Sequence, residues 1–328
     1  MPWHIKQKIV GFTDPVTQMN LQTCSKDLRN VVDKAPVVYD RLNINLKTDK
    51  IEIVMHPFSK PSECFDQNLT VCFQKRNQKV VIEKTGLISS NIEKDGDYLD
   101  QAMKYLGKIF YKNPKSLVTV HRLMIDLTCA SRLSIDFLAF EARKTEFLRN
   151  FQHLARGEFS VRHIFLHIEI NEQHIVSVLQ NLRPRVLKCI SITGNYNDVY
   201  RECLLSEVTA LEQWKQARIL VCTGFLCTMP LDTWKHFETV PFMQFAIMDL
   251  EIVKYIIRKL GKSPTWRRGQ FFADVFPQDV LDYFRQFPKV PAENEVREII
   301  IPNCDTQVIH VTMYPDVLVL RKQPYVPR

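Results

Sequence analysis

The stretch Leu187–Thr223, LKCISITGNYNDVYRECLLSEVTALEQWKQARILVCT, contains two apolar segments on either side of a helical one. Each apolar segment places its large side chains in the order apolar-x-x-apolar-x-apolar. The two sets are Leu187, Ile190 and Ile192, then Ala217, Leu220 and Cys222. Such alternation is typical of a half-buried strand, and Ser206–Gln216 between them reads as a helix. The stretch therefore predicts a strand, a crossover helix and a second, parallel strand.

The same pattern recurs before and after this stretch. Its further copies are Val120, Leu123 and Ile125; Val161, Ile164 and Leu166; Val240, Met243 and Phe245; and Val296, Ile299 and Ile301 with Asn303. Helices are expected at Ser134–Arg156, Glu172–Leu182, Asp249–Leu260, which Gly261 would close, and Pro277–Phe287. The copies are unevenly spaced, so a strict solenoid is not expected. The sequence predicts an α/β fold with an irregular, leucine-rich-repeat-like, curved sheet backed by helices.

Residues 37–118 read differently, as hairpins followed by a helix. Pairs of alternating segments flank polar turns at Leu42–Leu46 with Ile51–Met55, and at Leu69–Gln74 with Lys79–Lys84. Asp97 is placed to cap a helix that ends near Asn113-Pro114. A later hairpin is expected at Gln307–Met313 with Val317–Arg321. The sequence thus predicts hairpins at both ends of the sheet, with region limits at 1–36, 37–118 and 119–328.

Bulk composition restricts the class of protein. With 328 residues and 45% hydrophobic content, the chain is long enough for about two domains and is not a disordered protein. Its formal charge of +8, from 44 basic and 36 acidic residues, is only mildly basic, so a dedicated nucleic-acid binder is not expected. Nine cysteines lack paired spacing, and neither a signal peptide nor a membrane span is expected. We therefore expect reduced thiols in a cytoplasmic or nuclear protein without membrane contact.

Residues 1–34 carry more apolar side chains than so short a segment can bury. They read as three short helices, with start signals at Asp14-Pro15 and at Ser25. A unit below about 40 residues seldom folds without outside support. The apolar side chains are therefore expected either to cover the core of this chain as a helical cap or to bind another protein.

The segments Met1–Val10 and Cys24–Asp33 resemble an F-box. Such modules begin with Leu-Pro, continue with apolar residues at helical spacing and later contain Val-Ser-Lys-x-Leu-Arg; here Met1 stands at the Leu position. The resemblance implies that residues 1–36 bind a Skp-type adaptor, and through it a cullin-based ubiquitin ligase. The adaptor-binding residues would be Pro2, Ile5, Ile9, Ser25, Leu28 and Val32.

Landmarks in the C-terminal half resemble the FTH domain, which accompanies F-boxes in a nematode family, the F-box A proteins. They are Trp214-Lys215-Gln216-Ala217-Arg218, His236-Phe237, Asp249-Leu250 and Ser263-Pro264-x-Trp266. Arg218 departs from the usual Lys, and Trp266 from the common Phe. The resemblance places the domain at about residues 170–305. It implies an adaptor that captures a target protein for ubiquitination and has no chemistry of its own.

No catalytic, cofactor or metal site is expected. The sequence contains no Gly-x-Ser-x-Gly, Gly-x-x-x-x-Gly-Lys or His-Glu-x-x-His motif. Cys222, Cys227 and His236 suggest zinc, but Cys222 falls on an inward strand position and a fourth ligand is missing. A buried thiol is the better interpretation. Trp214 is expected to pack in the core and His236 to be structural, so we expect a protein that is not an enzyme.

A target-binding surface is expected on the exposed concave face of the sheet and on one basic helix. Alternate strand side chains would face a protein partner, and basic side chains four residues apart would attract an acidic one. The candidates are Phe165, His167, Ser191, Thr193, Gln244, Ala246, Lys254 and Arg258. The ordinary interpretation of the basic residues is a solvated helix face. The expected function is a substrate receptor for an unknown target; the alternatives are an interaction scaffold without a ligase link and an RNA-associated regulator.

Overall fold

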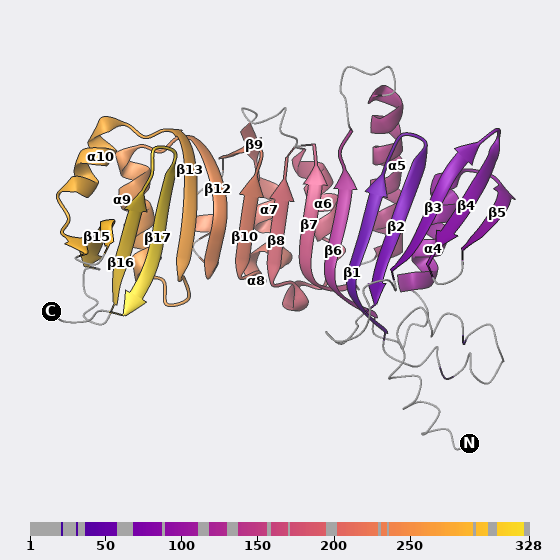
Figure 1. Cartoon of the computed structure of the whole chain (residues 1–328), viewed down its shortest axis with the longest axis horizontal. Coiled ribbons are helices and arrows are strands. Elements are labelled where there is room, and N and C mark those ends of the chain that lie inside the picture. The colour runs from indigo at the N-terminus through magenta and orange to yellow at the C-terminus, as the bar shows by residue number, and fades with distance from the viewer. Residues whose placement is uncertain are drawn as a thin grey trace. The chain divides into compact units, whose positions relative to one another are not determined.

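The computed structural model describes residues 21, 31, 37–57, 68–86, 89–110, 118–129, 137–155, 159–169, 171–194, 202–228, 231–234, 236–290, 293–300 and 307–324. These residues form a mixed α/β fold, which confirms the predicted fold class at that level. The chain divides into two compact units (Figure 1). Unit 1 comprises Met1–Ile168 and His174–Leu187, and unit 2 comprises Glu169–Gln173 and Lys188–Arg328.

Unit 1 contains a mixed sheet in the strand order β7-β6-β1-β2-β3-β4-β5. Its strands are β1 (Val37–Leu46), β2 (Lys50–Pro57), β3 (Leu69–Arg76), β4 (Lys79–Thr85), β5 (Ser90–Asp95), β6 (Val118–Leu127) and β7 (Ser160–Ile168). Strands β1 to β5 pair antiparallel, as the predicted hairpins require. Strands β1, β6 and β7 pair parallel. The first hairpin strand is therefore also part of the parallel region.

The apolar-x-x-apolar-x-apolar pattern lies in register across these parallel strands. The buried sets are Tyr39, Val120 and Val161; Leu42, Leu123 and Ile164; and Ile44, Ile125 and Leu166. Strand β1 thus carries a further copy of the pattern, although sequence analysis assigned this segment only to a hairpin. Because all nine side chains are buried on one face, the opposite side chains of each strand are left for solvent or partners.

Helices α4 (Tyr98–Phe110), α5 (Phe137–Ala155) and α6 (Glu172–Leu179) follow these strands and lie behind them in Figure 1. Asp97 caps α4 as predicted, because its Oδ1 accepts a hydrogen bond from Leu99 N at 2.8 Å. The other carboxylate oxygen of Asp97 binds Arg143 of α5 at 2.8 Å. Further along, the Phe110 ring packs at a tilt against Phe159, with a centroid distance of 3.9 Å. The helices are thus fixed by both a polar and an aromatic contact.

Unit 2 contains a second mixed sheet segment, in the order β14-β15-β16-β17-β13-β12-β10-β8. Its strands are β8 (Cys189–Thr193), β10 (Ile219–Thr223), β12 (Thr239–Ile247), β13 (Arg268–Val275), β14 (Lys289–Val290), β15 (Glu293–Ile300), β16 (Gln307–Met313) and β17 (Val317–Pro324). Strands β8, β10, β12 and β13 are parallel, whereas β13 to β17 pair antiparallel. A separate parallel pair joins β9 (Glu202–Leu204) to β11 (Leu226–Thr228).

The helices of unit 2 are α7 (Ser206–Ala210), α8 (Glu212–Gln216), α9 (Leu250–Lys262) and α10 (Gln278–Arg285). The predicted helix Ser206–Gln216 is two short ones, because Leu211 adopts extended backbone angles of φ −67° and ψ 142°. Asp249 caps α9 as predicted, with Ile252 N at 2.8 Å from its Oδ1. Gly261 does not close that helix, which runs to Lys262.

One further expectation was wrong, and two strands were not predicted. The segment around Val296 and Ile299 is not a parallel repeat copy, because β15 pairs antiparallel with β16. Strand β13 was not predicted; it begins with Arg268-Gly269, and neither residue favours a strand. Strand β5 was missed as well, because all six of its residues are exposed and polar ones dominate. The miss at β5 shows that alternation identifies strands only where one face is apolar.

Candidate interaction site

Phe165 and His167 lie on the open face of the unit 1 sheet. Both are half-buried, whereas Ile164, Leu166 and Ile168 between and beside them are buried on the other face. The register places Phe165 opposite Met124 of β6, and His167 opposite Asp126. This alternation agrees with the prediction that the two side chains face away from the core.

The rows on this open face extend to β1. Met124 lies opposite Asn43, and Asp126 lies opposite Asn45. Asp126 is held in place because its Oδ1 accepts hydrogen bonds from Thr128 N at 3.0 Å and from Thr128 Oγ1 at 2.6 Å. The Oδ1 atom of Asn43 is buried and has no hydrogen-bond partner among the described residues. This face therefore combines an aromatic ring, a thioether and amide groups that can accept or donate hydrogen bonds.

The next row, toward the amino ends of these strands, is rich in cations. Arg41, Arg122 and His163 are aligned across β1, β6 and β7. Arg122 is 3.4 Å from Asp40, so part of this charge is neutralised. Burial, together with the nearby Arg41, lowers the pKa of His56 on β2. The open face is thus mildly positive at one end, apolar at Phe165 and Met124, and carries the Asp126 carboxylate in the row beyond them.

Ser191 and Thr193 lie on β8 of unit 2. Ser191 is only 7% exposed, so its expected exposure on a concave surface is wrong. The reason is packing on both faces of β8, because Cys189, Ile190 and Ile192 beside it are also buried and the strand has no open face there. Thr193 is half-buried, and its Oγ1 accepts a hydrogen bond from Thr223 Oγ1 at 3.0 Å. Ser191 is therefore not part of an accessible surface, whereas Thr193 is partly exposed.

Gln244 and the basic helix residues lie in different layers of unit 2. Gln244 is half-buried on β12, opposite Phe272 of β13. Lys254 and Arg258 lie on α9, where Lys254 Nζ is 3.1 Å from Glu251 and 5.9 Å from the ring centre of Tyr283 on α10. The prediction of one surface made by strands and helix is therefore not supported for these residues. For Ala246, only its place on β12 is described.

The large aromatic residues of the FTH landmarks lie in the core of unit 2. Trp214 is fully buried, its Nε1 donates to Thr233 O at 2.9 Å, and its ring meets Phe237 edge-on at 5.1 Å. His236 Nε2 lies 2.9 Å from Trp214 O, and burial lowers the pKa of this imidazole. Trp266 is only 1% exposed. The predictions that Trp214 is a core residue and that His236 is structural are confirmed.

The suggested zinc ligands have other roles where they are described. Cys222 is a buried free thiol on β10, and His236 binds the Trp214 carbonyl. Within the described ranges, no group of three or more His, Cys, Asp or Glu side chains is placed to hold a metal ion. In that same part of the chain, no helix is both long and apolar enough to cross a membrane.

The predicted adaptor-binding residues lie outside the described residues. These are Pro2, Ile5, Ile9, Ser25, Leu28 and Val32. In residues 1–36, the structure describes only Leu21 and Val31, both helical, and the Val31 side chain is fully buried. The three-helix F-box therefore remains a prediction.

Comparison with known families gives one match: residues 142–287 match the family model of the FTH domain. The matched range begins within α5, ends just after α10 and includes all four landmark segments. It supports the resemblance of this chain to FTH-domain proteins. No solved structure matches the chain.

Proposed function

We propose that this protein is a non-catalytic substrate-recognition subunit of a Skp–cullin–F-box ubiquitin ligase. Residues 1–36 would bind the Skp-type adaptor, and the FTH region would capture a target protein. The observation that carries the proposal is the FTH match at 142–287 in a chain whose first 34 residues resemble an F-box. The FTH family is consistent with a role in protein interaction, and the ligase link rests on the F-box resemblance.

The open face around Phe165 supports a binding role for unit 1. Protein interfaces depend on a few aromatic or arginine anchors surrounded by polar groups. Phe165 with Met124 supplies an apolar centre, and Asn43 and Asp126 supply polar groups beside it.

The adaptor link is tested by binding of recombinant Skp-type adaptor to the full chain, measured by calorimetry. A stable interface of this kind buries about 1,200–2,000 Å² and depends on buried apolar anchors. Ile5→Asp and Ile9→Asp are each expected to weaken binding by about thirtyfold or more, since each would bury an unpaired charge. Gln7→Asp introduces the same charge on the other side of a helix and is expected to change the affinity less than about threefold.

Failure of the unaltered protein to bind any Skp-type adaptor would refute the ligase link. Equal effects of the Ile5, Ile9 and Gln7 substitutions would show that the apolar face is not the contact. Either result leaves the second candidate, an interaction scaffold without a ligase link, because the FTH match does not include residues 1–36. An RNA-associated regulator has only the +8 charge and the basic residues of α9 in its favour.

A further inference from the structure

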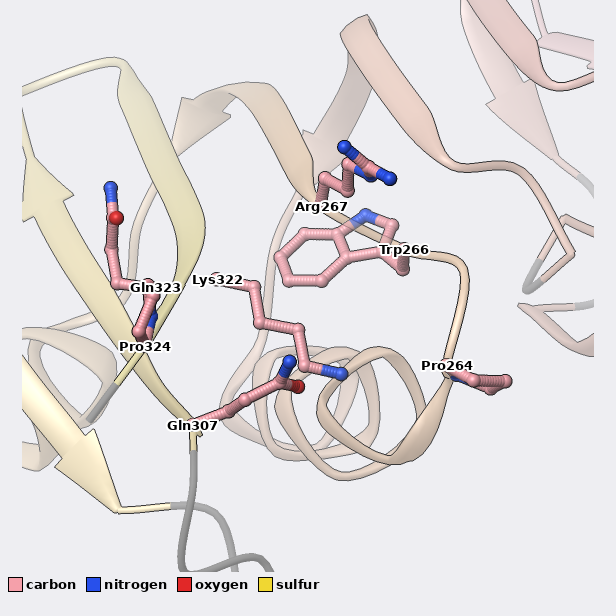
Figure 2. Close-up of a pocket in the computed structure, with 7 residues that line it drawn as sticks. All are labelled: Pro264, Trp266, Arg267, Gln307, Lys322, Gln323 and Pro324. Atoms are coloured by element: carbon pink, nitrogen blue, oxygen red, sulfur yellow. The ribbon is translucent and has the colours of Figure 1, made fainter.

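A cavity of about 230 Å³ lies beside Trp266 at one end of unit 2. Its walls come from the loop between α9 and β13, from the start of β16 and from the last residues of β17. Lys322 Nζ donates to Ser263 O at 2.8 Å. Figure 2 shows the Arg267 guanidinium pointing away from Lys322 and Gln307. The polar groups that line the cavity therefore do not converge on one ligand, and the edge of the unit 1 sheet is the more complete binding surface.

Strand β5 forms that edge. It pairs antiparallel with β4, and no strand follows on its other side among the described residues (Figure 1). All six of its residues, Ser90–Asp95, are exposed. The backbone N–H and C=O groups along its outer side are therefore open to a further strand.

An apolar row on the core face of the unit 1 sheet ends at this edge. The registers place side by side, from β1 to β5, Leu46, Ile51, Phe73, Ile82 and Ile92. Their exposed fractions in that order are 2%, 0%, 2%, 6% and 42%. Exposed apolar surface forgoes the favourable free energy of burial. The row thus leaves its last member, Ile92, open at the edge of the sheet.

The turn between β3 and β4 indicates which backbone groups of β5 point outward. The turn Asn77–Gln78 has φ values of 46° and 68°, as a two-residue hairpin loop requires. In such a hairpin the residues flanking the turn form a hydrogen-bonded pair, and bonded and non-bonded pairs then alternate. Counted along β4, this alternation directs the backbone groups of Ile82 to β5 and those of its neighbour Ile92 to β4. We therefore expect the N–H and C=O groups of Asn91 and Glu93 to point away from β4.

We propose that β5 pairs antiparallel with β5 of a second copy of this chain, so that the unit 1 sheets of two molecules join. With five residues of each β5 paired, the two-fold axis passes either at Ile92 or at Glu93. An axis at Glu93 would set two carboxylates opposite each other, which is destabilising. An axis at Ile92 brings the two Ile92 side chains together. It sets Asn91 opposite Glu93, and Ser90 opposite Lys94, of the second copy.

The register centred on Ile92 fits both the side chains and the backbone. Because the Ile92 backbone is directed to β4, the two Ile92 residues form a non-hydrogen-bonded pair, in which side chains lie closest. The bonded pairs are then Asn91 with Glu93, on either side of the axis. Charged residues often protect an edge strand from pairing, but here Glu93 and Lys94 meet only the uncharged Asn91 and Ser90. The strand is therefore complementary to itself, so a second copy is the partner that fits it.

Sedimentation velocity of the full chain at rising concentration tests the dimer. The contact is short, so we expect a reversible dimer that is detected at or below about 0.5 mM. Ile92→Lys would set two ammonium groups opposite each other and is expected to weaken dimerisation about tenfold or more. Leu138→Lys makes the same kind of change at a side chain of α5 that is 78% exposed. This control is expected to alter the dissociation constant less than about twofold.

Ser90 tests the register, because it faces Lys94 of the second copy only when the axis lies at Ile92. The dimer would contain this pair twice, so Ser90→Glu is expected to tighten dimerisation about fivefold and Ser90→Lys to weaken it about fivefold. Ser90 also faces Lys84 of β4, so the melting temperature of each variant is measured alongside. Hydrogen exchange at the amides of Asn91 and Glu93 is expected to slow as the concentration rises.

A chain that stays monomeric up to about 0.5 mM would overturn the proposal. Equal effects of Ile92→Lys and Leu138→Lys would overturn it too, since the contact would then not include Ile92. Equal effects of Ser90→Glu and Ser90→Lys would reject the register centred on Ile92. The inference goes beyond the proposed function and does not depend on it. Adaptor binding, measured on the same preparations, therefore tests the ligase link separately from the dimer.

Discussion

Replacing Trp214 tests whether the FTH landmarks are structural. The indole is fully buried, its Nε1–H is bonded to Thr233 O, and its edge-on contact with Phe237 has a centroid distance of 5.1 Å. A buried tryptophan removes roughly 150–250 Å² from water, which at about 25 cal/mol/Å² gives about 4–6 kcal/mol. That range is an upper bound because unfolded chains are partly compact. We therefore expect Trp214→Ala to lower the free energy of unfolding by about 4 kcal/mol.

Two milder substitutions separate the contributions to this loss in the free energy of unfolding. Trp214→Phe keeps an aromatic ring against Phe237 but removes the hydrogen bond to Thr233, so we expect a loss of about 1–2 kcal/mol. Lys215→Ala, on the same short helix, removes an exposed ion pair with Glu212 and is expected to cost at most about 0.5 kcal/mol.

Urea unfolding followed by far-UV circular dichroism measures these differences, with separate transitions fitted if the two units unfold independently. Hydrogen exchange at the amides of β10 and β12 gives a local reading of the same effect. A Trp214→Ala protein within about 1 kcal/mol of the unaltered one would refute the assignment of Trp214 to the core of unit 2. An equal loss of unfolding free energy for Trp214→Phe and Trp214→Ala would also refute this assignment.

Two further predictions concern Gly224 and His236. Gly224 has a φ of +74°, and a Cβ there would be 2.7 Å from Gly194 O, so Gly224→Ala is expected to lower the melting temperature by about 5 °C or more. Gly86→Ala, where the nearest atoms are 3.4 Å away, is the control, and equal shifts would contradict the steric argument. Burial lowers the pKa of His236, so the unfolded state binds more protons and stability is expected to fall as pH drops below about 6.5. His236→Gln should flatten the dependence of melting temperature on pH between 7.5 and 5.5, and an unchanged slope would show that other groups cause it.

The strands that sequence analysis located are those with one strongly apolar face. The last two residues of the sets ending in Ile125, Leu166, Ile192, Cys222 and Phe245 lie on strands, since burial of one face imposes period two on the sequence. Pairing direction was not visible at β15, because the same alternation suits a parallel and an antiparallel neighbour. The place of a strand in a sheet is decided by contacts between segments that are distant in sequence, and the local residue pattern carries no information on such contacts.

The candidate site was predicted less completely than the fold. Alternation placed Phe165 and His167 on the open side of β7, as the structure shows. It failed at Ser191, because burial of both faces of β8 depends on what surrounds that strand and not on its own residues. The cavity beside Trp266 could not be derived either, since Gln307 and Lys322 reach it from strands whose partners were unknown. The signal available in the sequence was Arg267, a basic residue just before the start of β13, a strand that was not predicted.

The central position of β1 in unit 1 affects how this protein is made. Strand β1 has β2 on one side, but its other edge is filled only by β6, which starts at Val118. The roughly 60 residues from the end of β2 to the start of β6 require about 3–12 s of translation at 5–20 residues per second. During that interval the nascent chain presents an unpaired strand edge, and such an edge can recruit other emerging polypeptides. We therefore expect this protein to fold more efficiently when a chaperone shields the β1 edge until its parallel neighbour β6 has been made.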